Sequence, residues 1–234
     1  MKPIIGIIEW PYEDKDGDKI FEILNDVVNC VIRAGGMPVG IFPTQTEDFV
    51  NTRLDDIKSM TADESDDLLS AVDRCDAIIK PGALKIYEYE RLIHSYTVCK
   101  NMPYLGICAG MQIMSGYRST INNIRIDENN MINHHQKGYA HDVYPIKDTL
   151  LSRIVGIDKF PVYSRHKYHI ADAGVNKVCA VAEDGIIEAI ENPNCNYNLG
   201  LQWHPEFAPS SDEITKKIFE SLIEEAKVYS KIKR

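Results

Sequence analysis

Short apolar runs alternate with amphipathic stretches through the first half of the chain, and no other feature of the sequence restricts its fold as much. Four runs have the length and composition of buried strands: Lys2–Trp10, Met37–Phe42, Asp76–Lys80 and Pro103–Ile107. Four other stretches have the apolar spacing of helices: Asp18–Ala34, Asp63–Val72, Tyr87–Lys100 and Ala109–Tyr117. This alternation predicts a parallel sheet with helices on both faces.

The second half of the chain has a different pattern. Short alternating segments predict strands and hairpins near Tyr139–Tyr144, Val162–Ser164, Val178–Glu183, Ile186–Glu191 and Asn198–His204. Ser210–Tyr229 follows as an amphipathic helix with a polar, acidic N-terminus. Since no internal repeat or linker divides the sequence, we expect residues 1–234 to form one domain, in which an antiparallel hairpin region is added to the parallel sheet.

The charge balance and the cysteines argue against several classes of protein. The 234 residues carry 26 Lys and Arg against 35 Asp and Glu, a net charge of −9, which disfavours nucleic acid and anionic membranes as partners. No stretch reaches the roughly 20 apolar residues of a membrane span, and the start at Met1 has no signal-peptide pattern. The six cysteines form no C-x-x-C pair, so we expect reduced thiols and a cytoplasmic location.

One cysteine lies in a distinctive setting. Gly106-Ile107-Cys108-Ala109-Gly110 matches the G-x-S-x-G pattern of a nucleophile elbow, with cysteine in place of serine. Such a turn from strand to helix exposes one side chain above the sheet, and the glycines remove Cβ atoms that would collide in the bend. The N-terminus of the following helix favours a thiolate. The alternative is a buried cysteine that only packs in a glycine-rich turn.

A candidate base for this thiol occurs far along the chain. Gln202-Trp203-His204-Pro205-Glu206 ends a strand-like run, and in extended chain His204 and Glu206 project to the same side. A thiol nucleophile needs a base within hydrogen-bond reach and a group that orients the base. These two residues can fill both roles, although either one alone is also an ordinary polar residue of a surface strand.

Together, G-I-C-x-G-M-Q at 106–112 and Q-W-H-P-E at 202–206 resemble the class I glutamine amidotransferase superfamily. The start K-P-I-I-G-I and the segment E-D-G-I-I-E-A-I-E at 183–191 resemble its γ-glutamyl hydrolase branch, which contains the γ-glutamyl-γ-aminobutyrate hydrolases. The resemblance covers nearly the whole chain, from Pro3 to Glu206. It implies an α/β fold of the flavodoxin-like type, a three-layer sandwich with a mostly parallel central sheet.

The resemblance also implies the chemistry. A γ-glutamyl amide would be hydrolysed by a triad of Cys108, His204 and Glu206 through a glutamyl thioester. Backbone N–H groups of Ala83 and Ala109 would form the oxyanion hole. Ala83 departs from the family, which usually has glycine there, but a backbone donor survives that change.

Residues for substrate binding follow from the same resemblance. Gln112, one helical turn beyond Cys108, matches the glutamine that contacts the glutamyl head group in the family. Where the branch carries V-N-S-x-H-H-Q, agreement is limited to Val162, Ser164 and His166. Further candidates for the pocket are Arg165, His166 and Tyr168. An exposed Arg165 without a ligand is the alternative for that residue.

The sequence leaves three functions open. The first is a free-standing hydrolase of a small γ-glutamyl compound, and the second is a glutaminase subunit that supplies ammonia to a separate synthetase chain. The third is a catalytically silent binding or regulatory module that kept the fold. The leaving group stays open among γ-aminobutyrate, another amine, a nucleotide-linked phosphoramidate and ammonia, and so does a homodimer.

A histidine-rich segment raises the question of a metal. His134 and His135 precede His141, but the sequence has no matching second cluster at metal-ligand spacing, and the thiol mechanism requires no metal. We therefore predict no metal site and no cofactor, and interpret the segment as a polar loop near the mouth of the active site.

Overall fold

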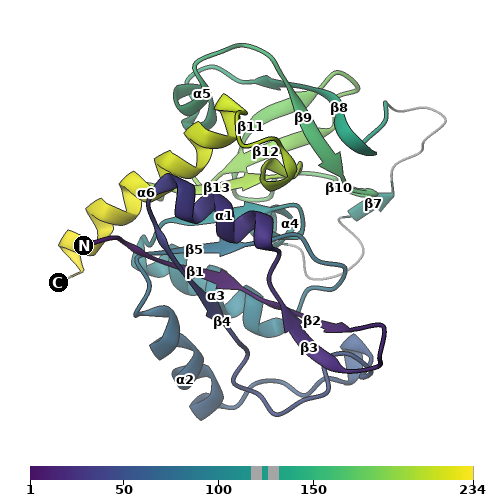
Figure 1. The fold of residues 1–234 in the computed structure, drawn as a ribbon, viewed down its shortest axis with the longest axis vertical. Coiled ribbons are helices and arrows are strands. Elements are labelled where there is room, and N and C mark those ends of the chain that lie inside the picture. The colour runs from purple at the N-terminus through teal and green to yellow at the C-terminus, as the bar shows by residue number, and fades with distance from the viewer. Residues whose placement is uncertain (117–122, 126–131, 234) are drawn as a thin grey trace.

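The computed structural model describes residues 1–116, 123–125 (backbone only) and 132–233, and within them one sheet of nine strands runs through both halves of the chain (Figure 1). The strands lie in the order β4 (Met37–Ile41), β1 (Ile4–Ile8), β5 (Ala77–Lys80), β6 (Tyr104–Ile107), β13 (Asn198–Leu201), β12 (Ile187–Glu191), β11 (Lys177–Ala182), β8 (His135–Pro145) and β9 (Phe160–Arg165).

The sheet is parallel at one end and antiparallel at the other. From β4 to β13 each strand is parallel to its neighbour, and from β13 to β9 each is antiparallel. The expected α/β class and the added antiparallel region are both present. The description of the sheet as mostly parallel fits only the first end, because the described strands form four pairings of each kind. Connections such as that between β11 and β12 are too short for the crossover that parallel pairing needs.

Two groups of helices cover the two faces of the sheet (Figure 1). One group is α1 (Asn25–Ala34), α5 (Leu150–Val155) and α6 (Glu213–Ile232), and the other is α2 (Ala62–Val72), α3 (Glu88–Lys100) and α4 (Ala109–Met114). Neighbouring strand residues alternate between the two cores. Ile79 and Leu105 belong to the core that holds α1 and α6, whereas Ile78 and Tyr104 belong to the core under α2 and α3. The molecule therefore has three layers.

One helix prediction in the first half was wrong in part. The stretch Asp18–Ala34 begins as strand β3 (Lys19–Glu22), which pairs with β2 (Trp10–Glu13) in a largely exposed hairpin. The side chain of Asp14 accepts two backbone N–H groups of the turn at 2.9 Å each, and Gly17 has φ 86°. This polar turn fixes the hairpin, so the helix starts only at α1.

Several short elements were not predicted. They are α5, the two-stranded pair β7 (Asn123–Arg125) with β10 (Tyr168–Ile170), and the 3-10 helices η1 (Leu54–Asp56) and η2 (Pro205–Phe207). The predicted helix Ala109–Tyr117 ends at Met114, and Tyr117 itself lies outside the described residues. Elements this short carry too few residues to show a period.

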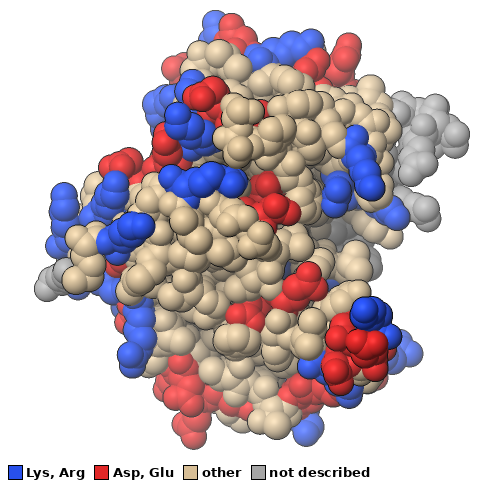
Figure 2. Space-filling model, viewed as in Figure 1, with Lys and Arg blue, Asp and Glu red and all other residues tan. Residues whose placement is uncertain are grey.

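Both signs of charge occur on the face of the molecule seen in Figure 2. Figure 2 shows Lys and Arg interspersed with Asp and Glu, and acidic side chains gather around α2 at the lower end of the view. Of the helices in the described part of the chain, none combines the length and the apolar character that crossing a bilayer requires.

Candidate active site

Cys108 lies at the turn from β6 to α4. It directly precedes the first helical residue, Ala109, and has φ 52° and ψ −102°, a conformation that costs a non-glycine residue energy. Its N–H donates to the carbonyl of Leu201 on the neighbouring strand β13 at 2.7 Å, which fixes the turn. Its side chain is partly exposed. The strained backbone thus holds a thiol at the N-terminus of a helix, where an anion is favoured.

Two glycines make this turn sterically possible. A Cβ on Gly106 would lie 2.5 Å from the carbonyl carbon of Gly110, and a Cβ on Gly110 would lie 2.3 Å from the carbonyl oxygen of Lys80. Both obstacles are backbone atoms, which cannot rotate out of the way. These distances give the two glycines the role that the sequence pattern predicted for them.

His204 follows strand β13 and directly precedes η2. Its Nδ1–H donates to Glu206 Oε1 at 2.8 Å, and its backbone N–H donates to the carbonyl of Tyr163 at 2.7 Å. Burial by itself lowers the pKa of His204, but the Glu206 carboxylate and the hydrogen-bonded Cys108 sulfur raise that pKa to about 10. His204 is therefore a cation at neutral pH, with Nε2 left to face the thiol.

Gly82 shows how close the thiol and the imidazole lie. A Cβ on Gly82 would be 2.6 Å from Cε1 and 3.4 Å from Nε2 of His204, and 3.3 Å from Cβ of Cys108. The loop at 81–83 therefore passes directly beside both side chains, and only a glycine leaves the space between them open. Ala83 lines the same cavity as Cys108, so this loop can present a backbone N–H to an oxyanion formed at the thiol.

A buried ion pair, missed by the sequence analysis, holds this loop. Lys80 is 0% exposed, and its Nζ lies 3.0 Å from Glu90 Oε1 and donates to the carbonyl of Pro81 at 2.9 Å. The other oxygen of Glu90 accepts the N–H of Tyr87 at 2.8 Å. The signal in the sequence was a lysine that ends an apolar strand, because a charge in that position requires a buried partner.

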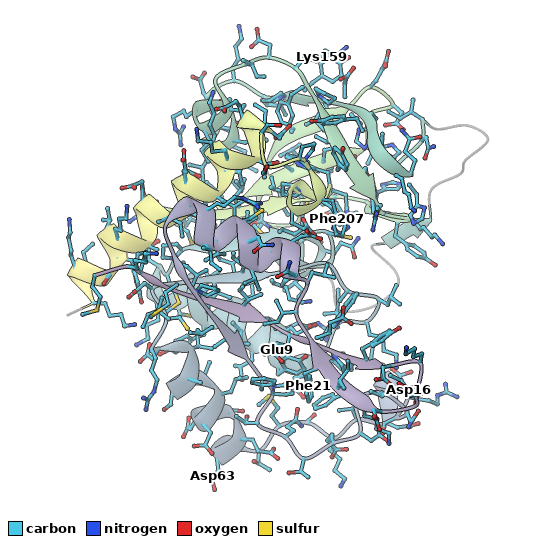
Figure 3. All side chains as sticks on the ribbon, viewed as in Figure 1. Glu9, Asp16, Phe21, Asp63, Lys159 and Phe207 are labelled. Atoms are coloured by element: carbon cyan, nitrogen blue, oxygen red, sulfur yellow. The ribbon has the colours of Figure 1, made fainter. Side chains whose placement is uncertain are left out.

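An aromatic ring stacks on the imidazole of His204 and helps to hold it in place. The Phe207 ring stacks on His204 with 5.2 Å between ring centroids and 24° between planes, and the Arg165 guanidinium lies 4.3 Å from the Phe207 centroid. Figure 3 shows Phe207 on η2, which packs against α1 and β9. Arg165 is exposed and lies at the edge of the site.

A cavity of about 460 Å³ opens at the thiol. Its lining includes six residues that the sequence assigned to the site: Ala83, Cys108, Gln112, Arg165, His166 and Tyr168. The rest of its described lining is Leu54, Leu84, Lys85, Ile86, His135 and Lys167. Three of these residues are basic (Lys85, Arg165 and Lys167), and among the described lining residues none is acidic. The cavity is thus locally positive in a chain whose net charge is −9.

Comparison with known proteins agrees with this geometry. The family model described as Peptidase C26 matches residues 3–206. The chain belongs to the Peptidase C26 family. Its relatives and structural neighbours place it in the class I glutamine amidotransferase-like superfamily. Protein NtpR of Enterococcus hirae is 24% identical over 96% of this chain and 100% of its own length. CTP synthase of Chlamydia caviae is 28% identical over 73% of this chain and 37% of that longer protein.

Solved structures support the same fold for this Peptidase C26 member. The glutaminase domain of CTPS from Trypanosoma brucei, with bound acivicin, superposes with a TM-score of 0.67 and 19% identity, covering 97% of this chain and 94% of that one. A glutamine amidotransferase from Thermotoga maritima superposes with a TM-score of 0.56 and 14% identity, covering 97% of both chains. At these identities the likeness concerns the fold alone.

Two histidine-bearing segments of this Peptidase C26 chain are more buried than the sequence suggested. The side chain of His166 is 1% exposed, and its Nδ1–H donates to the carbonyl of Tyr168 at 3.0 Å while Nε2 lies 3.4 Å from Glu188 Oε1. The two ring nitrogens of His166 thus face Glu188 and the backbone, while the residue also lines the cavity. The segment expected as a polar loop is strand β8 with buried His134 just before it and buried His141 within it.

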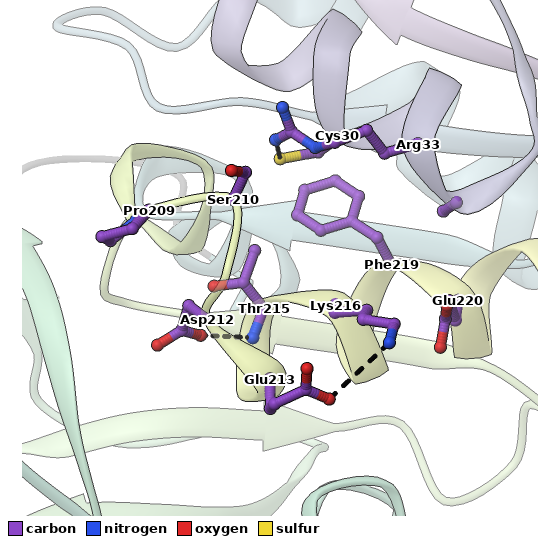
Figure 4. Close-up of a pocket in the computed structure, with 11 residues that line it drawn as sticks. Cys30, Arg33, Pro209, Ser210, Asp212, Glu213, Thr215, Lys216, Phe219 and Glu220 are labelled. Atoms are coloured by element: carbon purple, nitrogen blue, oxygen red, sulfur yellow. Dashed lines mark hydrogen bonds and ion pairs between the residues drawn. The ribbon is translucent and has the colours of Figure 1, made fainter.

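A second cavity, of about 300 Å³, lies between α1 and the start of α6 (Figure 4). On its wall Arg33 donates to the Cys30 sulfur at 3.2 Å, and Thr215 N–H donates to Asp212 at 2.7 Å. Its described lining holds none of the residues that the sequence assigned to the site. The cavity at Cys108 is therefore the better candidate for an active site.

Proposed function

We propose that this chain is a cysteine hydrolase that cleaves the γ-glutamyl amide bond of a small γ-glutamyl compound and releases glutamate. The observation that carries the proposal is the placement of Cys108 and His204. A partly exposed thiol at a helix N-terminus faces an imidazole whose other nitrogen is bound to the buried Glu206. This is the nucleophile–base–orienter arrangement of a covalent hydrolase.

In the first half of the reaction, the Cys108 thiolate attacks the γ-carbonyl carbon and forms a C–S bond. The carbonyl oxygen becomes an oxyanion beside the backbone N–H groups of Ala83 and Ala109. When the C–N bond breaks, His204 Nε2–H gives its proton to the leaving amine. The raised pKa of His204 supports this role, because it keeps the proton available at neutral pH.

In the second half, water hydrolyses the glutamyl thioester. His204, now neutral, takes a proton from the water as the water oxygen attacks the thioester carbon, and the C–S bond then breaks. Glutamate leaves and Cys108 returns as a thiolate beside the imidazolium. Glu206 holds the Nδ1–H tautomer of His204 throughout, so that Nε2 is always the nitrogen that exchanges the proton.

The charge of the cavity supports an anionic substrate. Lys85, Arg165 and Lys167 line it, and a γ-glutamyl compound brings at least one carboxylate that such groups can bind. An amine leaving group that carries its own anionic group, such as γ-aminobutyrate, matches the lining better than a cationic amine does.

A panel of γ-glutamyl amides tests the proposal, with glutamate release measured for leaving groups that are anionic, neutral and cationic. Cys108→Ala is the control for chemistry, and intact-mass measurement after rapid quenching detects the thioester. We expect the anionic member to have the highest kcat/KM and Cys108→Ala to be inactive. Hydrolysis by Cys108→Ala at the wild-type rate would exclude the mechanism, and no reaction of Cys108 with any γ-glutamyl electrophile would favour a silent module.

A second candidate function is a glutaminase subunit whose ammonia passes to a synthetase chain. Exposed apolar side chains at the cavity favour it, because Leu84 is 99% exposed, Tyr168 48% and Leu54 41%, and exposed apolar groups around an opening suit a covering partner. The panel separates the two functions. Slow hydrolysis of glutamine with no activity on larger γ-glutamyl amides would favour the glutaminase.

A further inference from the structure

Four buried side chains outside the proposed triad converge on one point. His141 and Glu188 lie in β8 and β12, His134 lies just before β8, and His166 lies between β9 and β10. One nitrogen of each histidine and one oxygen of Glu188 all lie within 4.8 Å of one another. We propose that this His₃Glu cluster binds a divalent transition-metal ion, with zinc as the metal that its donors fit best.

Strand pairing builds the cluster. The N–H of His166 and the hydroxyl of Ser164 both donate to the carbonyl of His134, at 3.2 and 2.8 Å, which ties the end of β9 to the start of β8. The β8–β9 register shifts between His135 and His141. Such a bulge changes the face to which a side chain points, and here it brings His141 to the side of Glu188.

In each histidine, one ring nitrogen donates a hydrogen bond. This bond determines that the other ring nitrogen has the free lone pair. His134 Nε2–H donates to Asp184 Oδ2 at 2.8 Å, while Nδ1–H of His141 and of His166 donates to the carbonyls of Asp142 and Tyr168, at 3.3 and 3.0 Å. When the rings are neutral, the three remaining nitrogens are unprotonated and can bind a metal ion. Histidines that ligate metals are held by the same kind of outer hydrogen bond.

The converging atoms have no other partner. Outside the cluster, none of the three facing nitrogens and neither oxygen of Glu188 has a hydrogen bond to the described residues, and within it His134 Nδ1 lies 3.1 Å from Glu188 Oε1. The four side chains are at most 2% exposed. Three acceptor nitrogens around a buried carboxylate would leave five lone-pair groups without a donor, which is costly in an interior. A cation at their centre satisfies the three nitrogens and the oxygen of Glu188 that faces them.

The three distances from Glu188 Oε1 to the histidine nitrogens lie near those of a tetrahedral ion, and all four atoms lie within 4.8 Å of one another. Glu188 Oε1 lies 3.1 Å from His134 Nδ1, 3.4 Å from His166 Nε2 and 3.6 Å from His141 Nε2. Metal–ligand bonds of about 2.0–2.1 Å give tetrahedral edges of about 3.3–3.4 Å. Nitrogen and carboxylate donors in this number suit zinc, and four protein ligands leave no open position, which is typical of structural sites.

Charge balance also favours a divalent ion. Glu188 contributes one negative charge at the centre, and Asp184, bound to the outer nitrogen of His134, contributes a second one. A divalent cation makes the buried group neutral as a whole. Because His166 starts the turn that carries Lys167 and Tyr168 along the Cys108 cavity, a bound ion would hold one wall of that cavity in place without taking part in the chemistry.

Zinc binding by the full chain tests the proposal. Tag-free protein carrying Cys108→Ser, which removes the exposed thiol as a competing ligand, is treated with chelator, dialysed and titrated with Zn²⁺ against a chromophoric chelator. We expect one equivalent to bind and to raise Tm, and Co²⁺ to give the intense visible absorption of a four-coordinate site. His141→Ala and Glu188→Gln should lose both the binding and the rise in Tm.

His169→Ala is the matched control. His169 likewise donates Nδ1–H to a following carbonyl, that of Ile170 at 3.1 Å, and its Nε2 is unpartnered among the described residues, but it lies outside the cluster. This variant should bind zinc as the parent does. Absence of zinc binding by the parent, or equal binding by Glu188→Gln, which keeps the shape of the side chain, would overturn the proposal.

Discussion

The two ends of the sheet build their polar groups in different ways. At the parallel end, Cys108 and His204 follow two strands that lie side by side, β6 and β13, and each sits in a short contiguous motif. At the antiparallel end, the His₃Glu cluster takes two residues from the β8 region, one from the turn after β9 and one from β12. Polar residues at the carboxyl ends of parallel strands are easy to recognise in a sequence. Residues that are brought together by the pairing of antiparallel strands form no contiguous sequence motif.

Substitutions at the two ends of the sheet should have different effects. Substitutions at the parallel end should lower the rate of the proposed hydrolysis or disturb the turn that presents the thiol. Substitutions at the antiparallel end should alter ion binding and leave the chemistry nearly intact.

Glu206→Gln should reduce kcat by about 10³- to 10⁴-fold, because the amide no longer fixes the Nδ1–H tautomer of His204 or stabilises its positive charge. The measurement is glutamate release from the best substrate of the panel. Glu213→Gln, an exposed residue at the start of α6, is the control. A Glu206→Gln enzyme within tenfold of wild type would remove Glu206 from the mechanism.

Lys80→Met should lower the free energy of unfolding by about 4 kcal/mol, because it leaves the Glu90 carboxylate buried without its partner. Denaturant unfolding measures this. The double variant with Glu90→Gln should recover most of the loss, since no unpaired charge remains. If that double variant is stable but inactive, the hydrogen bond from Lys80 to Pro81 positions the loop beside Cys108. Equal stability of the single and double variants contradicts the argument.

Stability should fall as the pH rises from about 7 through about 10. The pKa of His204 is raised from 6.5 to about 10 in the folded chain, so the stabilisation by its neighbours is complete below pH 6.5 and is lost as the folded-state pKa is passed. The expected loss is a few kcal/mol. Denaturant midpoints across this range measure it, and the slope should be much smaller in Glu206→Gln. Parallel slopes in the two proteins would show that another group titrates.

Gly110→Ala should destabilise the fold by about 3 kcal/mol, because the new Cβ would meet the carbonyl oxygen of Lys80 at 2.3 Å. Gly185→Ala, in the turn between β11 and β12, is the contrasting control. Gly185 has φ 85° with nothing within 4 Å of its Cβ position, so only the conformational strain of about 1 kcal/mol is expected. Thermal unfolding of both variants distinguishes a clash at the elbow from simple loss of a glycine.

Asp184→Asn should weaken zinc binding by about 10- to 100-fold, because it removes the charge that holds the outer nitrogen of His134. Zinc affinity is measured by competition with a chelator, and kcat is measured at saturating zinc. The kcat should stay near that of the wild type, which is the smallest effect of the series. A large loss of kcat with unchanged zinc affinity would show that the two ends of the sheet are coupled through another route.

The sequence predicted the parallel end well because its signals are local. The strand before Cys108, the two glycines and the helix after it occupy one continuous stretch, and sterics alone require them. The ion pair of Lys80 with Glu90 was missed, since burial of a charged pair depends on packing that the sequence does not display.

The antiparallel end was predicted less well for the same physical reason. The hairpin strands were recognised, but the bulge that re-aims His141 and the pairing that brings His166 to His134 depend on strand register. In the sequence, Glu188 appeared as one residue of a predicted strand and of the segment 183–191 that resembles the γ-glutamyl hydrolase branch, with no role of its own. We therefore predicted no metal site from the sequence, and the cluster that carries the proposed zinc site was not recognised.

The hydrogen bond from Cys108 N–H to the carbonyl of Leu201 has a consequence for how the chain tolerates change. It joins the strand that carries the thiol to the strand that leads to His204, so their separation equals one strand spacing of about 4.8 Å. Insertions and deletions can change the length of the chain between the two strands, while the distance between the strands stays the same. The pairing of β6 with β13 therefore fixes the separation of the two strands, and changes of length are tolerated best in the loops between the elements that join them.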